Sequence, residues 1–325
     1  MRSFFYLLIH FAQKFLLWSS YIICSLLIRR SKKVEPNFVV GVDEVASILH
    51  QLSIALPESI TVNLTRNRLY SHRYSFNLGE YLGAKYFRHI ISPILLGYLA
   101  CRYSKFVYIS ANGFLNTYHD GRNYEFAFLK KKKAKIICYF TGSDIRSHKL
   151  LNAFAEKHKI DVITTYQGMV NKGADSPMRE LHRKKLAHAA ETYADVIFNP
   201  ATDQMGYFER ETLPFVNFYP DEKIKKNPDK WRNLDRITIV HSPSTPIIKG
   251  TPLVRAAIKK LQEEGYQFEY IELLNVKNEV VLKALGRAHI VLSQFYAFVP
   301  GIFGIEAMAN NSVLVTSADS RFERS

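Results

Sequence analysis

The sequence has few cysteines and no repeats. Its 325 residues include only Cys24, Cys101 and Cys138, which are widely spaced and form no Cys-x-x-Cys pair. This spacing excludes the common zinc and dithiol motifs and favours a reducing compartment, with the cysteines as small apolar packing residues. The sequence also lacks a solenoid repeat and any helix-turn-helix, zinc-finger or RNP-like signature, so a nucleic-acid-binding protein is a weak alternative.

Acidic residues are scarce relative to basic ones. Asp and Glu number 29 against 44 Lys and Arg, which gives a net charge of +15. This balance favours an anionic partner without choosing among nucleic acid, a phospholipid surface and a phosphorylated small molecule. A lysine run at 130–133 and 135 fits a solvated helix end better than a nucleic-acid or lipid grip. A hydrophobic content of 47% indicates a folded chain, long enough for two domains.

Residues 4–28 are strongly apolar, although His10, Gln13 and Lys14 interrupt them. The length suffices for a membrane-spanning helix, but a lysine near the middle costs about 2.5–3.5 kcal/mol. A secretory signal is disfavoured because the stretch is too long and no small-residue cleavage site follows it. A basic cluster comes directly afterwards, formed by Arg29, Arg30, Lys32 and Lys33.

We therefore expect segment 1–36 to be a membrane-associated helix with a basic flank. The preferred arrangement is a helix in the bilayer interface, with the basic cluster on anionic cytoplasmic headgroups. If the helix spans, the positive-inside rule still leaves the bulk of the chain in the cytoplasm. The alternative is a hydrophobic helix packed on the protein's own core or on another copy.

From residue 37 the hydrophobic pattern alternates between short strands and amphipathic helices, which predicts an α/β fold with parallel sheets. The predicted strands are 38–42, 61–64, 106–110, 136–140, 161–165, 195–200, 237–241, 268–272, 290–292 and 313–315. The predicted helices are 43–56, 78–99, 179–193, 202–210, 253–261, 279–285 and one containing Glu306. The charged, proline-containing stretch 221–236 is the best linker, so it separates predicted domains at 37–220 and 237–325.

Two segments near the end of the chain predict a nucleotide-sugar site. In 239–251, a strand ends at His241 and Ser242, and Lys249 and Gly250 come just before a helix. Unpaired N–H groups and the helix dipole favour a phosphate at such a point, and Lys249 adds positive charge. An ordinary strand-to-helix turn with a surface lysine is the alternative.

In the second segment, 301–309, Gly301 and Gly304 permit close approach of a ligand to the backbone. Glu306 follows in what is expected to be the first helical turn, where its carboxylate can accept two hydrogen bonds from a ribose diol. A helix-capping glutamate is the alternative.

Three further positions follow predicted strands of the first domain. Gly41 lies where backbone can approach a ligand, and Asp144 and Arg146 occupy the carboxyl end of strand 136–140. That edge binds ligands in doubly wound sheets, so both charges are functional candidates. A turn cap made by the Asp144 side chain is an equal alternative.

With these residues in view, the chain resembles the retaining GT-B glycosyltransferases of the family 4 type, particularly those that build bacterial surface polysaccharides. The resemblance covers about residues 39–316, and four segments carry it: Gly142 to Arg146, Ala194 to Pro200, Val240 to Thr251 and Phe303 to Ala309. It implies two Rossmann-like domains that face a cleft, with the acceptor on the first and a nucleoside-diphosphate sugar on the second.

By the same resemblance, Lys249 would contact the donor diphosphate, Glu306 the ribose hydroxyls, and Gly41 the loop facing the donor phosphates. Asp144 would lie near the transferred sugar or the acceptor. A retaining transfer builds negative charge on the departing diphosphate, so the protein contributes mostly positioning and charge stabilisation. The donor is a co-substrate; no cofactor and no metal are expected, and the sequence has no Asp-x-Asp motif of metal-dependent transferases.

The chain departs from the family pattern in three places. Phe298 stands where the first glutamate of an E-x7-E pair is common, and residues 245–248 lack the usual arginine before Lys249. The sequence given stops at Ser325, where further helices of the second domain would be expected, so we expect an incomplete donor-binding domain. The leading hypothesis is a membrane-associated glycosyltransferase of polysaccharide or lipid-linked glycan assembly. The alternative is a truncated, non-catalytic homologue that binds nucleotide or a partner protein.

Overall fold

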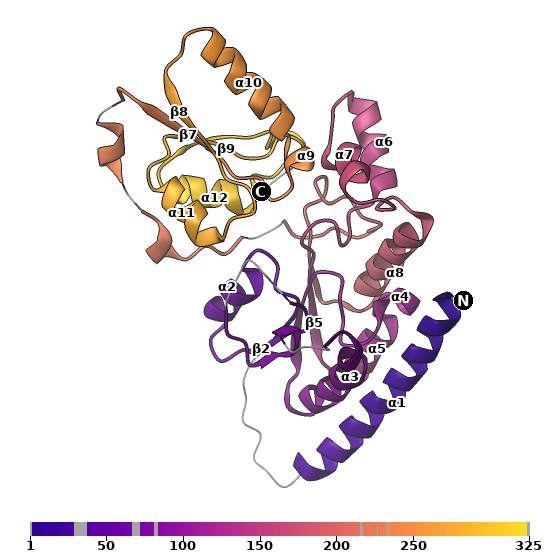
Figure 1. Ribbon diagram of the computed structural model, residues 1–325. Coiled ribbons are helices and arrows are strands. Elements are labelled where there is room, and N and C mark those ends of the chain that lie inside the picture. The colour runs from indigo at the N-terminus through magenta and orange to yellow at the C-terminus, as the bar shows by residue number, and fades with distance from the viewer. Residues whose placement is uncertain are drawn as a thin grey trace. The chain divides into compact units, whose positions relative to one another are not determined.

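The computed structural model describes residues 2–28, 38–66, 72–80, 84–214, 217–225, 227–232 and 234–323. The chain divides into two compact units (Figure 1). The first comprises Met1–Ser147 and Ser176–Phe218, and the second His148–Asp175 and Tyr219–Ser325. Segment 148–175 thus groups with the second unit, although the sequence placed it inside 37–220; the domain limits themselves stay a prediction.

The first unit is built on a parallel sheet in the order β3-β2-β1-β4-β5-β6. Its strands are β1 (Val39–Val42), β2 (Ile60–Asn63), β3 (Phe76–Asn77), β4 (Lys105–Ile109), β5 (Lys135–Tyr139) and β6 (Val196–Phe198). The helices are α1 (Arg2–Ile28), α2 (Ile48–Ala55), α3 (Ala84–Arg102), α4 (Thr117–Asp120), α5 (Asn123–Lys131) and α8 (Pro177–Tyr193). The strand order is that of a Rossmann sheet: β2 and β3 are added on one side of β1, and β4 to β6 on the other side. The switch point of the sheet lies between β1 and β4.

Both faces of this sheet are covered, as the continuous apolar strands require. On one face, Val39, Phe106 and Ile136 join a large cluster with α3, α5 and α8. On the other face, Val40 and Ile109 pack with α2. Alternate side chains of each strand therefore face opposite helical layers. The carboxyl ends of the strands lie at the edge of the sheet between these two layers.

The second unit contains a four-stranded parallel sheet in the order β10-β9-β7-β8. Its strands are β7 (Ile237–His241), β8 (Phe268–Glu272), β9 (Ile290–Leu292) and β10 (Val313–Val315). Its helices are α6 (His148–His158), α7 (Ile163–Val170), α9 (Pro246–Lys249), α10 (Thr251–Glu263), α11 (Asn278–Leu285) and α12 (Gly301–Ala309). β8 is added on one side of β7, and β9 and β10 on the other side, so the switch point of this sheet lies between β7 and β9. The α/β class, the parallel sheets and the apolar amino-terminal helix are confirmed.

Two predicted elements are wrong, and several begin elsewhere. Segment 161–165 is not a strand but leads into α7, because Thr165 accepts a hydrogen bond from the Val162 N–H at 3.1 Å and caps the helix. Val162 and Ile163 then pack on α6. Segment 202–210 forms turns instead of a helix. Helix α2 begins five residues later than predicted, and β3 was not expected.

Part of the expected linker 221–236 is docked on the second unit. Short 3-10 turns occupy 221–223 and 228–231. The Lys230 ammonium donates to the carbonyls of Ala288 and Asn310, each at 2.6 Å, where β9 and β10 begin. Burial lowers the pKa of Lys230. Low apolar content therefore did not prevent this segment from packing, because side chains of Asn227, Lys230 and Trp231 donate hydrogen bonds to carbonyls of the unit.

Candidate functional site

The switch point of the second sheet brings Lys249 and Gln294 together. Lys249 ends α9, which follows β7, and Gln294 comes two residues after β9. The Lys249 ammonium donates a hydrogen bond to the side-chain oxygen of Gln294. Ligands of open α/β sheets bind outside the carboxyl ends of the strands at such a point, so a cation lies where an anionic ligand is expected.

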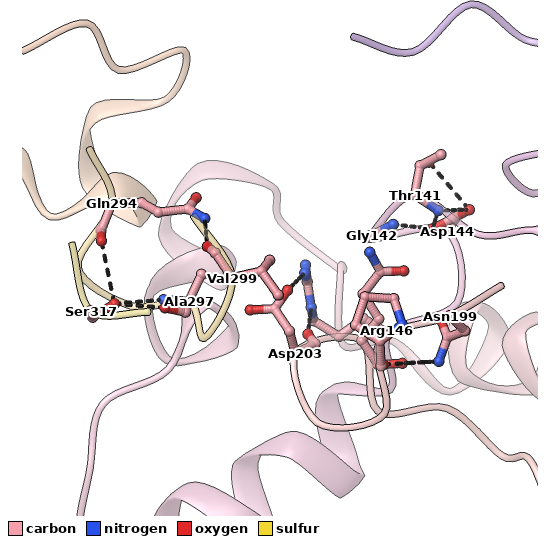
Figure 2. Close-up of polar contacts among 12 residues, drawn as sticks. Thr141, Gly142, Asp144, Arg146, Asn199, Asp203, Gln294, Ala297, Val299 and Ser317 are labelled. Atoms are coloured by element: carbon pink, nitrogen blue, oxygen red, sulfur yellow. Dashed lines mark hydrogen bonds and ion pairs between the residues drawn. The ribbon is translucent and has the colours of Figure 1, made fainter. Parts of the chain in front are cut away.

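Gln294 connects this lysine to the start of α12. Its side-chain nitrogen donates to the Val299 carbonyl at 2.5 Å, and its own carbonyl accepts from the Ser317 hydroxyl at 3.3 Å (Figure 2). Gly301 begins α12 with φ of +67°, and a Cβ there would meet the Gln294 amide at 3.4 Å. The sequence analysis missed Gln294, although its place directly after a strand was visible.

Glu306 lies in the second turn of α12, not in the first turn as expected, because the helix begins at Gly301. Its carboxylate accepts a hydrogen bond at 3.0 Å from the side-chain nitrogen of Asn278, the first residue of α11. Burial raises the pKa of Glu306, while the Asn278 bond and the charge of Lys223 act in the opposite direction. The carboxylate is thereby held beside two helix starts.

The other predicted donor-binding residues of this unit have internal contacts. His241 is fully buried, with Nδ1 2.7 Å from the Leu292 carbonyl and Nε2 2.9 Å from the Thr251 hydroxyl. Burial lowers the pKa of His241. The Ser242 hydroxyl donates to the Leu273 carbonyl at 3.3 Å. His241 thus ties β7 to β9 and to the first residue of α10.

Two glycines of this unit serve close packing. Gly250 has φ of +79° between α9 and α10, and a Cβ there would lie 3.0 Å from Phe295. A Cβ on Gly304 would lie 3.1 Å from the side chain of Leu314 on β10. Gly304 therefore lets α12 approach its own sheet, which accounts for this glycine without a ligand.

The switch point of the first sheet holds a different polar pair. Asp43 follows β1 and Asn112 lies three residues after β4, and the Asn112 side-chain nitrogen donates to the Asp43 carboxylate at 2.7 Å. The Thr65 hydroxyl, after β2, donates to the other oxygen at 3.0 Å. Burial raises the pKa of Asp43, and the charge of Asp144 acts in the same direction, against Arg88. Two carboxylates thus share this edge, and the sequence analysis had singled out only Asp144.

The carboxylate of Asp144 closes its own turn, as one of the two sequence interpretations held. It accepts hydrogen bonds from the N–H groups of Thr141, at 3.0 Å, and Gly142, at 2.6 Å (Figure 2). Arg146 turns into the protein, where it pairs with the Asp203 carboxylate at 2.9 Å. Arg146 is therefore an internal residue, whereas Asp144 stays half-buried at the edge.

Gly41, expected near the donor phosphates, lies inside β1. A Cβ at this position would come within 2.7 Å of the Val62 carbonyl oxygen on β2. The neighbouring strand thus explains the glycine. In the described parts of the chain, no group of three or more His, Cys, Asp or Glu residues is arranged to hold a metal ion.

Comparisons with known proteins yield distant structural likeness only. No protein-family model matches the chain, and no curated protein matches it. Among solved structures, Anabaena Alr3699/HepE in complex with UDP and glucose has a TM-score of 0.44 and 8% identity, covering 87% of this chain and 80% of that one. An alpha-glucosyltransferase in complex with UDP-glucose and DNA containing an abasic site has a TM-score of 0.44 and 10% identity, covering 88% and 81%. Likeness at this level does not identify the substrates of this chain.

Proposed function

We propose that this chain is a glycosyltransferase that uses a nucleoside-diphosphate sugar. The observation that carries the proposal is the Lys249 to Gln294 hydrogen bond at the switch point of the second sheet, beside the start of α12. A lysine and helix N–H groups suit a diphosphate. Glu306, held by Asn278, offers the carboxylate that suits a ribose diol.

In the proposed reaction, Lys249 stabilises the negative charge that grows on the departing diphosphate. Its bond to Gln294 positions the ammonium before the reaction, so little reorganisation is needed. We propose transfer with retention, in which positioning of donor and acceptor supplies most of the rate enhancement. No cofactor beyond the donor co-substrate enters this scheme.

We propose that the acceptor is a glycan or a lipid-linked glycan of polysaccharide biosynthesis. The first sheet supports this idea, because Asp43, Asn112 and Asp144 gather at its carboxyl edge. Carboxylate and amide oxygens accept hydrogen bonds from sugar hydroxyls. We further propose action at the inner face of the cell membrane, which the apolar α1 and the net charge of +15 support.

A turnover assay tests the proposal. Purified full-length chain is incubated with UDP- and GDP-sugars, with and without a chelator, and release of UDP or GDP is measured. Lys249→Ala and Glu306→Ala should each lower turnover strongly, whereas Lys259→Ala, at an exposed site on α10, should not. Full activity of both site variants would refute the assignment. NMR of the product's anomeric carbon distinguishes retention from inversion.

The second candidate function is nucleotide binding without turnover. Phe298 favours it, because the position that often carries the first glutamate of the E-x7-E pair packs against Phe154 and Phe322, with ring centroids 5.9 and 5.2 Å apart. Thermal unfolding with UDP, GDP and their sugars, paired with the turnover assay, separates the two functions. Stabilisation without turnover supports the second.

A further inference from the structure

Helix α1 buries its polar side chains and exposes its apolar ones. His10, Gln13, Leu17 and Ser20 form the buried face, and three of these four side chains are polar. A surface helix of a soluble protein shows the opposite pattern, with its apolar stripe toward the core. The reversal indicates that α1 has a second apolar environment outside the protein.

The buried polar groups are bonded to the first unit. The Gln13 side chain donates to the His89 carbonyl at 3.1 Å and accepts from the Asn116 N–H at 2.7 Å. The Ser20 hydroxyl donates to the Ile94 carbonyl at 2.7 Å. Gly97 permits this close packing, since a Cβ there would lie 2.8 Å from the Leu17 carbonyl oxygen. If α1 left the unit to cross a bilayer, these polar groups would lie without partners in the hydrocarbon core. Each unsatisfied backbone or side-chain group would then cost several kcal/mol.

Lys14, which argued against a spanning helix, is also accounted for. Its ammonium lies 4.1 Å from the centroid of the Tyr124 ring of α5. The lysine is thus directed toward the protein's own aromatic surface. The ammonium also lies 5.2 Å from the centroid of the Phe11 ring, so Lys14 stands at the border of the exposed apolar face and not at its centre.

Helix α3 packs along the buried side of α1 (Figure 1) and carries exposed apolar residues of its own. On α3, the exposed apolar residues recur at helical spacing from Phe87 to Ile94. Together the two helices present eleven large apolar side chains, each between 39% and 72% exposed. These residues define the α1–α3 surface: Leu8, Phe11, Phe15, Ile22, Ile23, Leu26, Leu27, Phe87, Ile90, Ile91 and Ile94.

Basic groups gather where α1 ends. The Lys132 ammonium lies 4.0 Å from the centroid of the Tyr21 ring, and Arg102 closes α3. In the sequence, Arg29, Arg30, Lys32 and Lys33 follow α1 directly. Each such charge near an anionic membrane is worth about 1 kcal/mol of attraction. A broad apolar face with a cationic end is complementary to anionic phospholipid: acyl chains beneath, phosphates at the rim.

We propose that the α1–α3 surface docks the protein on an anionic phospholipid bilayer, with α1 lying in the interface plane instead of crossing it. Helices of this kind are immersed in the interface by about 5–10 Å. The inference deepens the proposed membrane location by naming the contacting surface. It does not depend on glycosyltransfer, so its test is separate from the turnover assay.

Flotation of the full chain with preformed vesicles tests the proposal. Binding to phosphatidylcholine vesicles containing phosphatidylglycerol should exceed binding to phosphatidylcholine alone. Phe15→Asp on α1 and Ile90→Asp on α3 should each weaken binding about tenfold or more, because each variant lacks one apolar side chain that would be buried in the bilayer. The matched control is Leu253→Asp, an exposed leucine of α10. Circular dichroism and the unfolding midpoint establish that the variants fold.

Four outcomes would overturn the proposal in whole or in part. Unchanged vesicle binding by Phe15→Asp excludes the surface as the contact, and unchanged binding by Ile90→Asp excludes the part on α3. Lipid-independent dimers that both substitutions abolish would assign the surface to a second copy of the chain. A protease site placed ahead of Met1 should stay cleavable from outside the vesicles; its protection would mean that α1 crosses the bilayer.

Discussion

The side-chain nitrogen of Asn278 lies 3.0 Å from the carboxyl group of Glu306, so the first turn of α11 holds a buried acidic side chain on the second turn of α12. Both helices follow strands of one parallel sheet, and their starts lie at its carboxyl edge. The neighbouring helix α11 thus holds the Glu306 side chain toward the carboxyl edge of the sheet. Its role depends on whether the buried carboxyl group is ionised.

Glu306→Ala should reduce kcat/KM for the sugar donor about 10- to 100-fold. A hydrogen bond to a charged group contributes about 1.5–3 kcal/mol, and the alanine removes that acceptor. Glu306→Gln should recover part of the loss, because an amide oxygen still accepts. Steady-state kinetics with the donor varied provides the measurement. Glu279→Gln, at an exposed position on α11, is the control and should change neither parameter.

Donor affinity should fall as the pH decreases toward the raised pKa of Glu306. Burial raises this pKa above its ordinary value of 4.5, so the carboxylate is protonated at a higher pH than a solvent-exposed glutamate. Ionised Glu306 accepts two hydrogen bonds from a diol, and the protonated form accepts fewer. Calorimetric titration with UDP across the acid range measures the midpoint. An identical profile for Glu306→Gln would show that another group titrates.

Arg146→Met should lower the free energy of unfolding by about 3–5 kcal/mol. Arg146 and Asp203 form an ion pair whose side chains are 7% and 4% exposed, and removing one partner leaves a buried charge without it. Urea unfolding of Arg146→Met, of a variant at Asp203 and of the double variant gives the coupling free energy between the two side chains. For comparison, Lys259→Ala breaks the exposed pair with Glu263 and should cost about 0–1 kcal/mol. A small effect of Arg146→Met would indicate that water reaches Asp203.

Phe298→Glu should destabilise the second unit and leave turnover no higher. The residue is 9% exposed and packs with Phe154, Phe322 and α6, so a carboxylate there would be buried among rings. Phe298→Ala should cost about 3–5 kcal/mol, and Phe298→Leu less than about 1.5 kcal/mol. Denaturant unfolding and the turnover assay provide both measurements. Increased turnover of Phe298→Glu would instead mean that a carboxylate at position 298 assists the proposed reaction.

Most of the fold was predictable because a buried strand can be recognised from a short run of apolar residues. The strands 237–241, 268–272, 290–292 and 313–315 are confirmed at both ends. Segment 161–165 was not predictable from five residues, because its helical state depends on the Thr165 cap and on packing against α6. The grouping of α6 and α7 with the second unit likewise arises from contacts distant in sequence, such as Tyr166 with Tyr296.

The candidate site was predictable only in part. Lys249 was visible as a charge between a strand and a helix, but its partner Gln294 lies 45 residues away and is defined by strand order. Asp43 looked like the start of a helix, whereas it lies at a switch point and bonds to Asn112. Arg146 was expected to be a functional candidate at the ligand edge, whereas in the fold it pairs with Asp203 inside the protein. Local sequence thus gave the residue types, and the sheet order gave their pairing.

The protein should lose stability as the pH falls from about 6.5 toward 4. Burial lowers the pKa of His10 to about 4, despite the charge of Asp120, and lowers that of His182 to about 4 as well. Below pH 6.5 the unfolded chain binds protons at these positions while the folded chain does not, so the unfolded state is favoured. The loss is complete once the pH passes below the folded pKa values.

Thermal unfolding midpoints of the full chain between pH 7 and 4 measure this dependence. His10→Gln and His182→Gln should each make the decline less steep, because each removes one proton taken up on unfolding. His188→Gln, at an exposed position on α8, is the matched control variant. Since His10 lies on α1, its protonation should also loosen that helix from the first unit. Faster amide exchange in α1 at low pH would accompany the fall, and exchange independent of pH after correction for the intrinsic rate would contradict a neutral, buried His10.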